Sequence, residues 1–91
     1  MQVKVYAMLR PIVGTAVVPV ETQPGAPVQE RVDELVLRWP GLRPEMVNGS
    51  GELLNRIHIF INGRSIRFLD DVRTIIPDNA HVDIFPPVGG G

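Results

Sequence analysis

The chain has 91 residues, a formal net charge of −1 and an apolar fraction of 44%, which predict one small domain with a modest core. The near-neutral charge and an aromatic fraction of 5% argue against nucleic acid or an anionic membrane as the main partner. The absence of cysteine excludes disulfides and a thiol nucleophile, and no apolar run is long enough to cross a bilayer.

The first residues predict a pair of strands. Residues 3–9 alternate small apolar residues with larger or polar ones, which indicates a strand. We expect the proline and glycine within residues 10–14 to break it as a turn. Residues 16–20 indicate a second strand, and because Pro19 has no amide hydrogen we place this strand at a sheet edge.

Residues 28–39 show the spacing of a helix. Pro27 suits the first turn of a helix, where its missing amide hydrogen is not needed. One face carries the apolar side chains, which are Val28, Val32, Leu35, Val36 and Trp39. Pro40 and Gly41 end the helix, and we expect Trp39 to anchor its end in the core.

The second half of the chain predicts three more strands. They are residues 57–61, 65–68 and 81–85. Asn62-Gly63 is a strong signal for a tight turn after the first of them. We expect residues 42–55 to form an exposed connection, and Val72, Ile75 and Ile76 to be available to the core.

The predicted order is therefore β-β-α-β-β-β, an α+β arrangement. One main helix must cover one face of a mixed sheet of four to five strands. This order matches the β-grasp, or ubiquitin-like, architecture, in which the first and last strands usually lie parallel at the centre of the sheet.

The folded body offers no convincing catalytic or metal site. His58 and His81 stand alone in their strands without a nearby metal-ligand spacing. Ser50 and Ser65 have no adjacent base. Asp70-Asp71 is paired only in sequence, and a solvated turn is the expected environment for it.

A docking surface can be predicted from strand periodicity. His58 and Phe60 alternate with the isoleucines of their strand, and Phe85 alternates with Ile84 in the last strand. Phe60, Phe85 and His58 should therefore face away from the helix, and exposed aromatic residues often mark interfaces. The alternative is that a loop covers one of the phenylalanines.

The basic residues allow two interpretations. The arginines Arg10, Arg56, Arg64 and Arg67 could contact an acidic partner, although scattered surface charge is commoner. Lys4 is the only lysine. If copies of this protein were linked to one another by isopeptide bonds, Lys4 and the N-terminal amine would be the obvious acceptors.

The sequence divides into a folded domain, residues 1–85, and a C-terminal tail, residues 86–91. Pro86 and Pro87 stiffen the exit from the sheet, and Val88 precedes the glycines Gly89, Gly90 and Gly91. At full extension the tail reaches roughly 20 Å, enough to thread a partner's narrow channel and present the Gly91 carboxylate. The plain alternative is an unstructured end or a leftover linker.

The chain contains several characteristic segments in a fixed order. They are Val3-Lys4-Val5 with Leu9-Arg10, Trp39-Pro40-Gly41-Leu42, Ile59-Phe60-Ile61-Asn62-Gly63, Ile66-Arg67-Phe68-Leu69, Val82-Asp83-Ile84-Phe85-Pro86-Pro87-Val88 and Gly90-Gly91. This set resembles the MoaD/ThiS family of sulfur carrier proteins, and more closely its MoaD-like branch, over essentially the whole chain. Two positions differ from the usual family pattern. The turn before the last strand is Asp78-Asn79-Ala80, where the family usually has Asp-Gly-Asp, and Gly89 stands where Ala is usual. These differences weaken the assignment of the chain to one pathway.

The resemblance implies a carrier and not an enzyme. A separate E1-like enzyme would use ATP to adenylate the Gly91 carboxylate, and sulfur from a persulfide donor would displace AMP to leave a thiocarboxylate. No cofactor or metal is expected on the chain itself, and its location is expected to be cytoplasmic, without a signal peptide.

Four functions remain open. The leading one is the small subunit of molybdopterin synthase, in molybdenum cofactor biosynthesis, with a larger catalytic subunit accepting the tail. The second is a sulfur carrier for a synthase of cysteine or another sulfur metabolite. The third is a ubiquitin-like modifier joined to lysines through Gly91, and the fourth is a β-grasp binding module without terminal chemistry.

Overall fold

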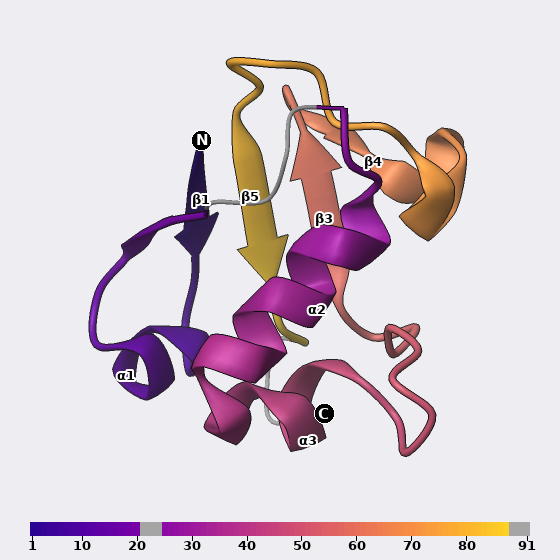
Figure 1. Cartoon of the computed structure of the whole chain (residues 1–91). Helices are drawn as coiled ribbons and strands as arrows, with labels where there is room; N and C mark the ends of the chain where they lie inside the picture. The colour runs from indigo at the N-terminus through magenta and orange to yellow at the C-terminus, as the bar shows by residue number, and fades with distance from the viewer. Residues whose placement is uncertain (21–24, 88–91) are drawn as a thin grey trace.

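The computed structural model describes residues 1–20 and 25–87, which form a five-stranded mixed sheet with the main helix α2 across one face (Figure 1). The strands are β1 (Gln2–Val5), β2 (Val17–Pro19), β3 (His58–Ile61), β4 (Arg64–Ser65) and β5 (Val82–Phe85). The α-helices are α1 (Leu9–Val13), α2 (Val28–Arg38) and α3 (Arg43–Met46). Short 3-10 helices are η1 (Pro40–Leu42), η2 (Ile66–Phe68) and η3 (Asp71–Arg73).

The sheet has the order β2-β1-β5-β3-β4. The first and last strands run parallel at its centre, with Val3 opposite Val82 and Val5 opposite Ile84. The other pairs are antiparallel. Both the β-grasp prediction and the edge position of the strand that contains Pro19 are confirmed.

The core lies between the sheet and α2. Alternate strand residues such as Val3, Ile59 and Ile84 are buried on the side that α2 covers. The predicted helix face is confirmed for its four aliphatic residues, which are Val28, Val32, Leu35 and Val36. Trp39 is partly buried against this core, and the Arg38 guanidinium lies 4.4 Å from its ring centroid.

The first strand is shorter than predicted, because residues 9–13 form the helix α1 and not a turn. Ala7 adopts a positive φ of 53° and ends the extended backbone. Leu9 and Val13 lie one helical turn apart and both point into the core. Gly14 ends the helix at φ 83° and donates its N–H to the Arg10 carbonyl.

The connection after α2 was predicted to be exposed, and this prediction is wrong for part of its length. Leu42, Met46 and Val47 are buried. Two short helices, η1 and α3, bring these apolar side chains under the end of the sheet. Pro44 lies in the first turn of α3, where its missing N–H costs nothing.

The segment after the predicted tight turn also differs. Asn62 and Gly63 have positive φ angles of 51° and 83°, as a two-residue hairpin requires, so the turn itself is confirmed. The following strand contains only two residues, however, and η2 then rotates Ile66 into the core. Further along the chain, Ile76 is buried as expected, whereas Ile75 is 54% exposed.

In the part of the chain that the structure describes, no helix is long and apolar enough to cross a membrane.

Candidate docking face and the start of the C-terminal segment

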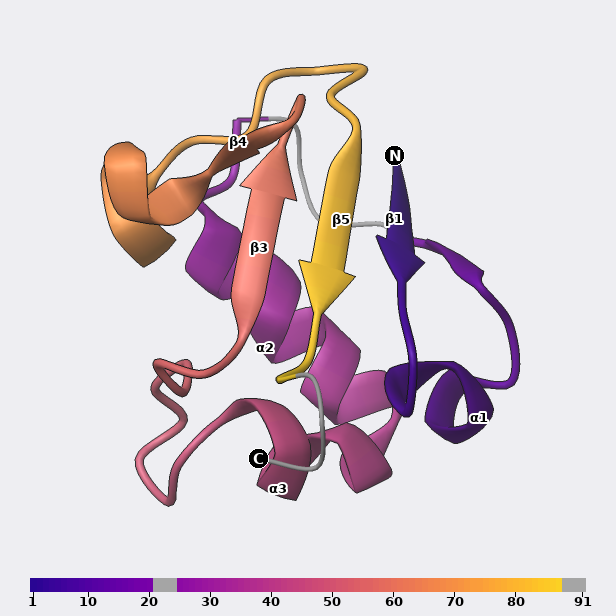
Figure 2. The same ribbon diagram turned by 180° about the vertical axis from the view of Figure 1, so that it is seen from behind.

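The face of the sheet opposite α2, here called the open face, is seen from the front in Figure 2. Strand alternation places on it the residues that the core does not use. In β3 these include His58 and Phe60, and in β5 they include Asp83 and Phe85. His58 is exposed and lies opposite Phe85 in the pairing of β3 with β5. The structure therefore brings the three residues of the predicted docking surface together.

Three aromatic rings form a contact group on this face, here called the aromatic cluster: Tyr6, Phe60 and Phe85. The Tyr6 and Phe85 rings are stacked, with centroids 4.1 Å apart and an interplanar angle of 15°. The Phe60 ring meets Phe85 edge-on, at 5.5 Å and 89°. All three residues are partly buried, and each keeps part of its surface exposed.

The sequence analysis missed Tyr6. Its position could have been found from the alternation of β1, because Val3 and Val5 are the buried residues and Tyr6 follows them on the opposite face. Contacts made across 77 positions in the chain, which no local pattern reveals, complete its environment.

A polar network adjoins the aromatic cluster. The Tyr6 hydroxyl donates a 2.8 Å hydrogen bond to Oδ1 of Asp83. His81 Nε2 lies 3.5 Å from the same oxygen. The hydrogen bond to Asp83, reinforced by burial and by the charge of that carboxylate, raises the pKa of the Tyr6 hydroxyl above 10.0. Tyr6 is therefore held on β5 by its hydroxyl and its ring.

The C-terminal segment begins directly after this cluster. Pro86, next to Phe85, is buried, and Pro87 is half-buried. The folded body therefore includes these two residues, although the sequence analysis assigned them to the tail. The remaining predicted tail residues, Val88, Gly89, Gly90 and Gly91, lie outside the described residues.

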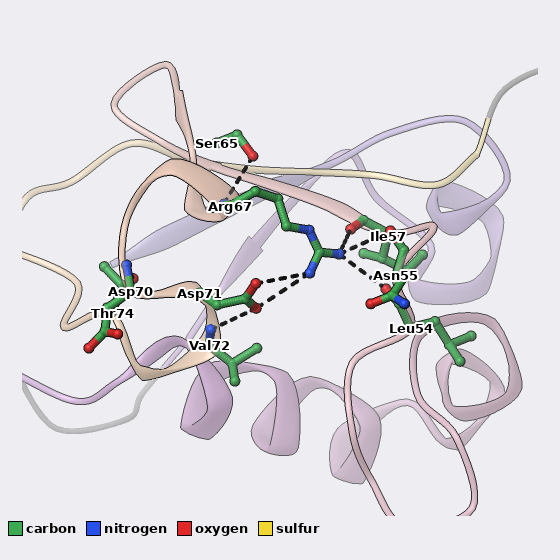
Figure 3. Close-up of polar contacts among 9 residues, drawn as sticks. All are labelled: Leu54, Asn55, Ile57, Ser65, Arg67, Asp70, Asp71, Val72 and Thr74. Carbon is green, nitrogen blue, oxygen red and sulfur yellow. Dashed lines mark hydrogen bonds and ion pairs between the residues drawn. The ribbon is translucent and has the colours of Figure 1, made fainter.

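Among the arginines that the sequence analysis considered for partner binding, Arg67 has a structural role. Its guanidinium donates to the carbonyl oxygens of Asn55 and Ile57, each at 3.0 Å, and pairs with Asp71 at 3.1 Å (Figure 3). It also reaches the Leu54 carbonyl at 3.5 Å. This group, here called the Arg67 clamp, joins η2 and η3 to the segment that leads into β3.

The acidic pair in sequence does not form a paired-carboxylate site. Asp71 accepts hydrogen bonds from Arg67 and from the Val72 amide. The Asp70 amide instead donates to the Thr74 hydroxyl. Asp70 is exposed and the Asp71 side chain is 48% exposed, as expected for a solvated turn, although Asp71 also takes part in the clamp. Within residues 1–20 and 25–87, no group of three acidic or histidine residues is placed to hold a metal ion.

Comparison with known proteins gives consistent matches over the full length. A model of the ThiS family matches residues 3–91. The small archaeal modifier protein 3 of Haloferax volcanii is 28% identical, covering 100% of this chain and 98% of its own. The crystal structure of SAMP1 from Haloferax volcanii superposes with a TM-score of 0.85 at 28% identity, covering 99% of this chain and 97% of that one. The Amycolatopsis orientalis BexX/CysO complex contains a chain with a TM-score of 0.81 at 26% identity, covering 99% and 98%.

Proposed function

Because this chain belongs to the ThiS/MoaD family of ubiquitin-like sulfur carriers and modifiers, we propose that its working group is the terminal carboxylate of Gly91. In this proposal an E1-like enzyme adenylates that carboxylate and a sulfur donor converts it to a thiocarboxylate. The folded domain supplies recognition, and the partner enzymes supply catalysis.

The observation that carries the proposal is the continuity of the aromatic cluster with the C-terminal segment. Phe85 contacts both Tyr6 and Phe60, and the next residue, Pro86, is buried. A partner that binds this cluster is therefore held at the point from which the last residues depart. Residues 88–91 can extend at most about 14 Å from Pro87, so the partner's reacting site must lie within that distance of Pro87.

The proposed chemistry explains why activation is needed. A carboxylate is a poor electrophile, because its charge repels nucleophiles and its oxygen is a poor leaving group. Attack by the Gly91 carboxylate on the α-phosphate of ATP forms an acyl-adenylate and releases pyrophosphate. Attack on that carbonyl by a persulfide sulfur releases AMP, and a thiol reductant then cleaves the S–S bond to leave the thiocarboxylate. Glycines without side chains fit a narrow catalytic channel.

For the acceptor, we propose first the larger catalytic subunit of a molybdopterin synthase. The support is the resemblance of Phe85-Pro86-Pro87-Val88 and the terminal glycines to small subunits of that enzyme. The CysO relative supports the alternative of a synthase for cysteine or another sulfur metabolite. The relatives named small archaeal modifier proteins support conjugation to lysines of other proteins.

Reconstitution with purified components tests the proposal. The chain is incubated with the host's E1-like enzyme and ATP, and exchange of radioactive pyrophosphate into ATP is measured. Addition of a persulfide donor should then yield a thiocarboxylate at Gly91. The matched control is the chain without Gly90 and Gly91. If exchange is absent with the full chain, or equal with the shortened one, the terminal carboxylate is not the working group.

A further inference from the structure

Two cations flank one ring of the aromatic cluster. The Lys4 ammonium lies 5.4 Å from the Tyr6 ring centroid, and the Arg10 guanidinium carbon lies 5.2 Å from it. Arg10 is further oriented by its Nε, which donates to the Val5 carbonyl at 2.9 Å. A single ring thus positions two positive charges at one border of the open face.

Both charges are available to a partner. Among the described residues, neither Lys4 nor Arg10 takes part in an ion pair. Asp83 lies opposite Lys4 in the pairing of β1 with β5. Its Oδ1 already accepts from Tyr6 and lies near His81, and its side chain is only 14% exposed.

Three acidic residues lie on the other layer of the molecule. Glu30, Asp33 and Glu34 belong to α2, which covers the opposite face of the sheet. The chain is therefore slightly acidic in total while presenting a local positive border beside its aromatic cluster. Nucleic acid or an anionic membrane would require a broad field of positive charge, which a net charge of −1 does not provide.

From these contacts we infer that Lys4 and Arg10 recognise a carboxylate-bearing border around an apolar patch on the adenylating enzyme. The Phe60 and Phe85 rings fill the patch, and the two cations select the orientation by pairing with the carboxylates at its border. Arg10 suits this role because its two terminal nitrogens remain free for a bidentate contact while Nε is held by Val5. This inference rests on the proposed function and adds the chemistry of the partner's surface to it.

The test measures binding apart from catalysis. The full chain is titrated into the host's purified E1-like enzyme without ATP, at several salt concentrations. The double variant Lys4→Met/Arg10→Met should bind about tenfold more weakly, with a smaller dependence on salt. The charge-preserving variant Lys4→Arg should retain nearly the original affinity, whereas Arg10→Lys should lose part of it, because an ammonium group cannot form the bidentate contact.

The matched control removes two charges elsewhere. Arg56 and Arg64 are exposed and form no contact that these substitutions would break. The variant Arg56→Met/Arg64→Met should bind as the unmodified chain does, and thermal melts establish that each variant is folded. Equal binding by Lys4→Met/Arg10→Met and the unmodified chain would overturn the inference, as would an equal loss in the control pair.

Failure of the proposed function has a different signature. It would appear in the unmodified chain, as an absence of both binding and pyrophosphate exchange, and the inference would fall with it. If only the inference is wrong, the unmodified chain still binds the E1-like enzyme and supports pyrophosphate exchange. The Lys4→Met/Arg10→Met variant then binds that enzyme as tightly as the unmodified chain does. Stronger binding to anionic vesicles or to RNA than to the enzyme would likewise contradict the assignment of a protein partner.

Discussion

The two faces of the sheet use their side chains differently. The face covered by α2 buries aliphatic residues such as Val3, Ile59 and Ile84 almost completely. The open face carries rings that are only partly buried and are fixed by directed contacts, including the stack of Tyr6 on Phe85 and the hydrogen bond to Asp83. The covered face therefore accounts for stability, and the open face preserves a defined surface for recognition.

Two adjacent residues in β3 test this difference between the covered face and the open face. One of them should give the largest loss of stability. Ile59 points into the core and Phe60 onto the open face. Ile59→Ala should lower the free energy of unfolding by about 3 kcal/mol, as measured by chemical denaturation. Phe60→Ala should cost about 1 kcal/mol, yet should weaken binding to the adenylating enzyme far more than Ile59→Ala does. Similar stability losses at both positions would contradict the division.

The Arg67 clamp should produce the next largest effect. Arg67→Met removes donors to the Asn55 and Ile57 carbonyls and the ion pair with Asp71. We expect a loss of about 2 kcal/mol in the free energy of unfolding, because carbonyl acceptors lose their partner. The exposed Arg64→Met variant is the control and should change stability by less than about 0.5 kcal/mol. An equal, small effect in both variants would mean that the clamp contributes nothing.

The Tyr6 hydroxyl should have a smaller and pH-dependent effect. Its pKa is raised in the folded protein, so above pH 10.0 the unfolded chain loses this proton first. Stability from the hydrogen bond to Asp83 is therefore complete below pH 10.0 and is lost as the pH rises through the folded pKa. Tyr6 is the only tyrosine, so its absorbance titration reports this pKa directly. The Tyr6→Phe variant should lack that part of the alkaline loss. A midpoint at or below 10.0 would contradict the hydrogen bond.

Deletion of Gly90 and Gly91 should have the smallest effect on stability. The aromatic cluster and the core residues named above belong to the described residues, which end at Pro87. The melting temperature should stay within about 1 °C of the original, since termini contribute little unless they are tied down. Adenylation should nevertheless be lost. A marked fall in melting temperature would show that these glycines belong to the folded structure.

Much of the fold follows from local sequence patterns. The apolar stripe of α2, the hairpin at Asn62-Gly63 and the edge position of Pro19 each rest on a local physical rule, and each is confirmed. α1 escaped prediction because five residues containing Pro11 are too few to display helical spacing. The burial of Met46 was missed because prolines and glycines around it suggest a loop.

The candidate site was predictable in part. Alternation in β3 and β5 was enough to place Phe60 and Phe85 together. Tyr6 and Lys4 come to lie beside these residues only through the pairing of β1 with β5, which links residues far apart in the chain. The role of Arg67 was missed for the same reason, because its carbonyl acceptors lie 10 to 13 positions away.

The intact mass of the protein purified from its native host tests the central claim most directly. Gentle handling is needed because a thiocarboxylate hydrolyses. The account predicts a species heavier by the replacement of one oxygen with sulfur, and fragmentation should locate the change at Gly91. An unmodified mass that persists even after incubation with ATP, a sulfur donor and the host's E1-like enzyme would contradict the carrier function. The aromatic cluster would then have to be understood as the surface of a binding module alone.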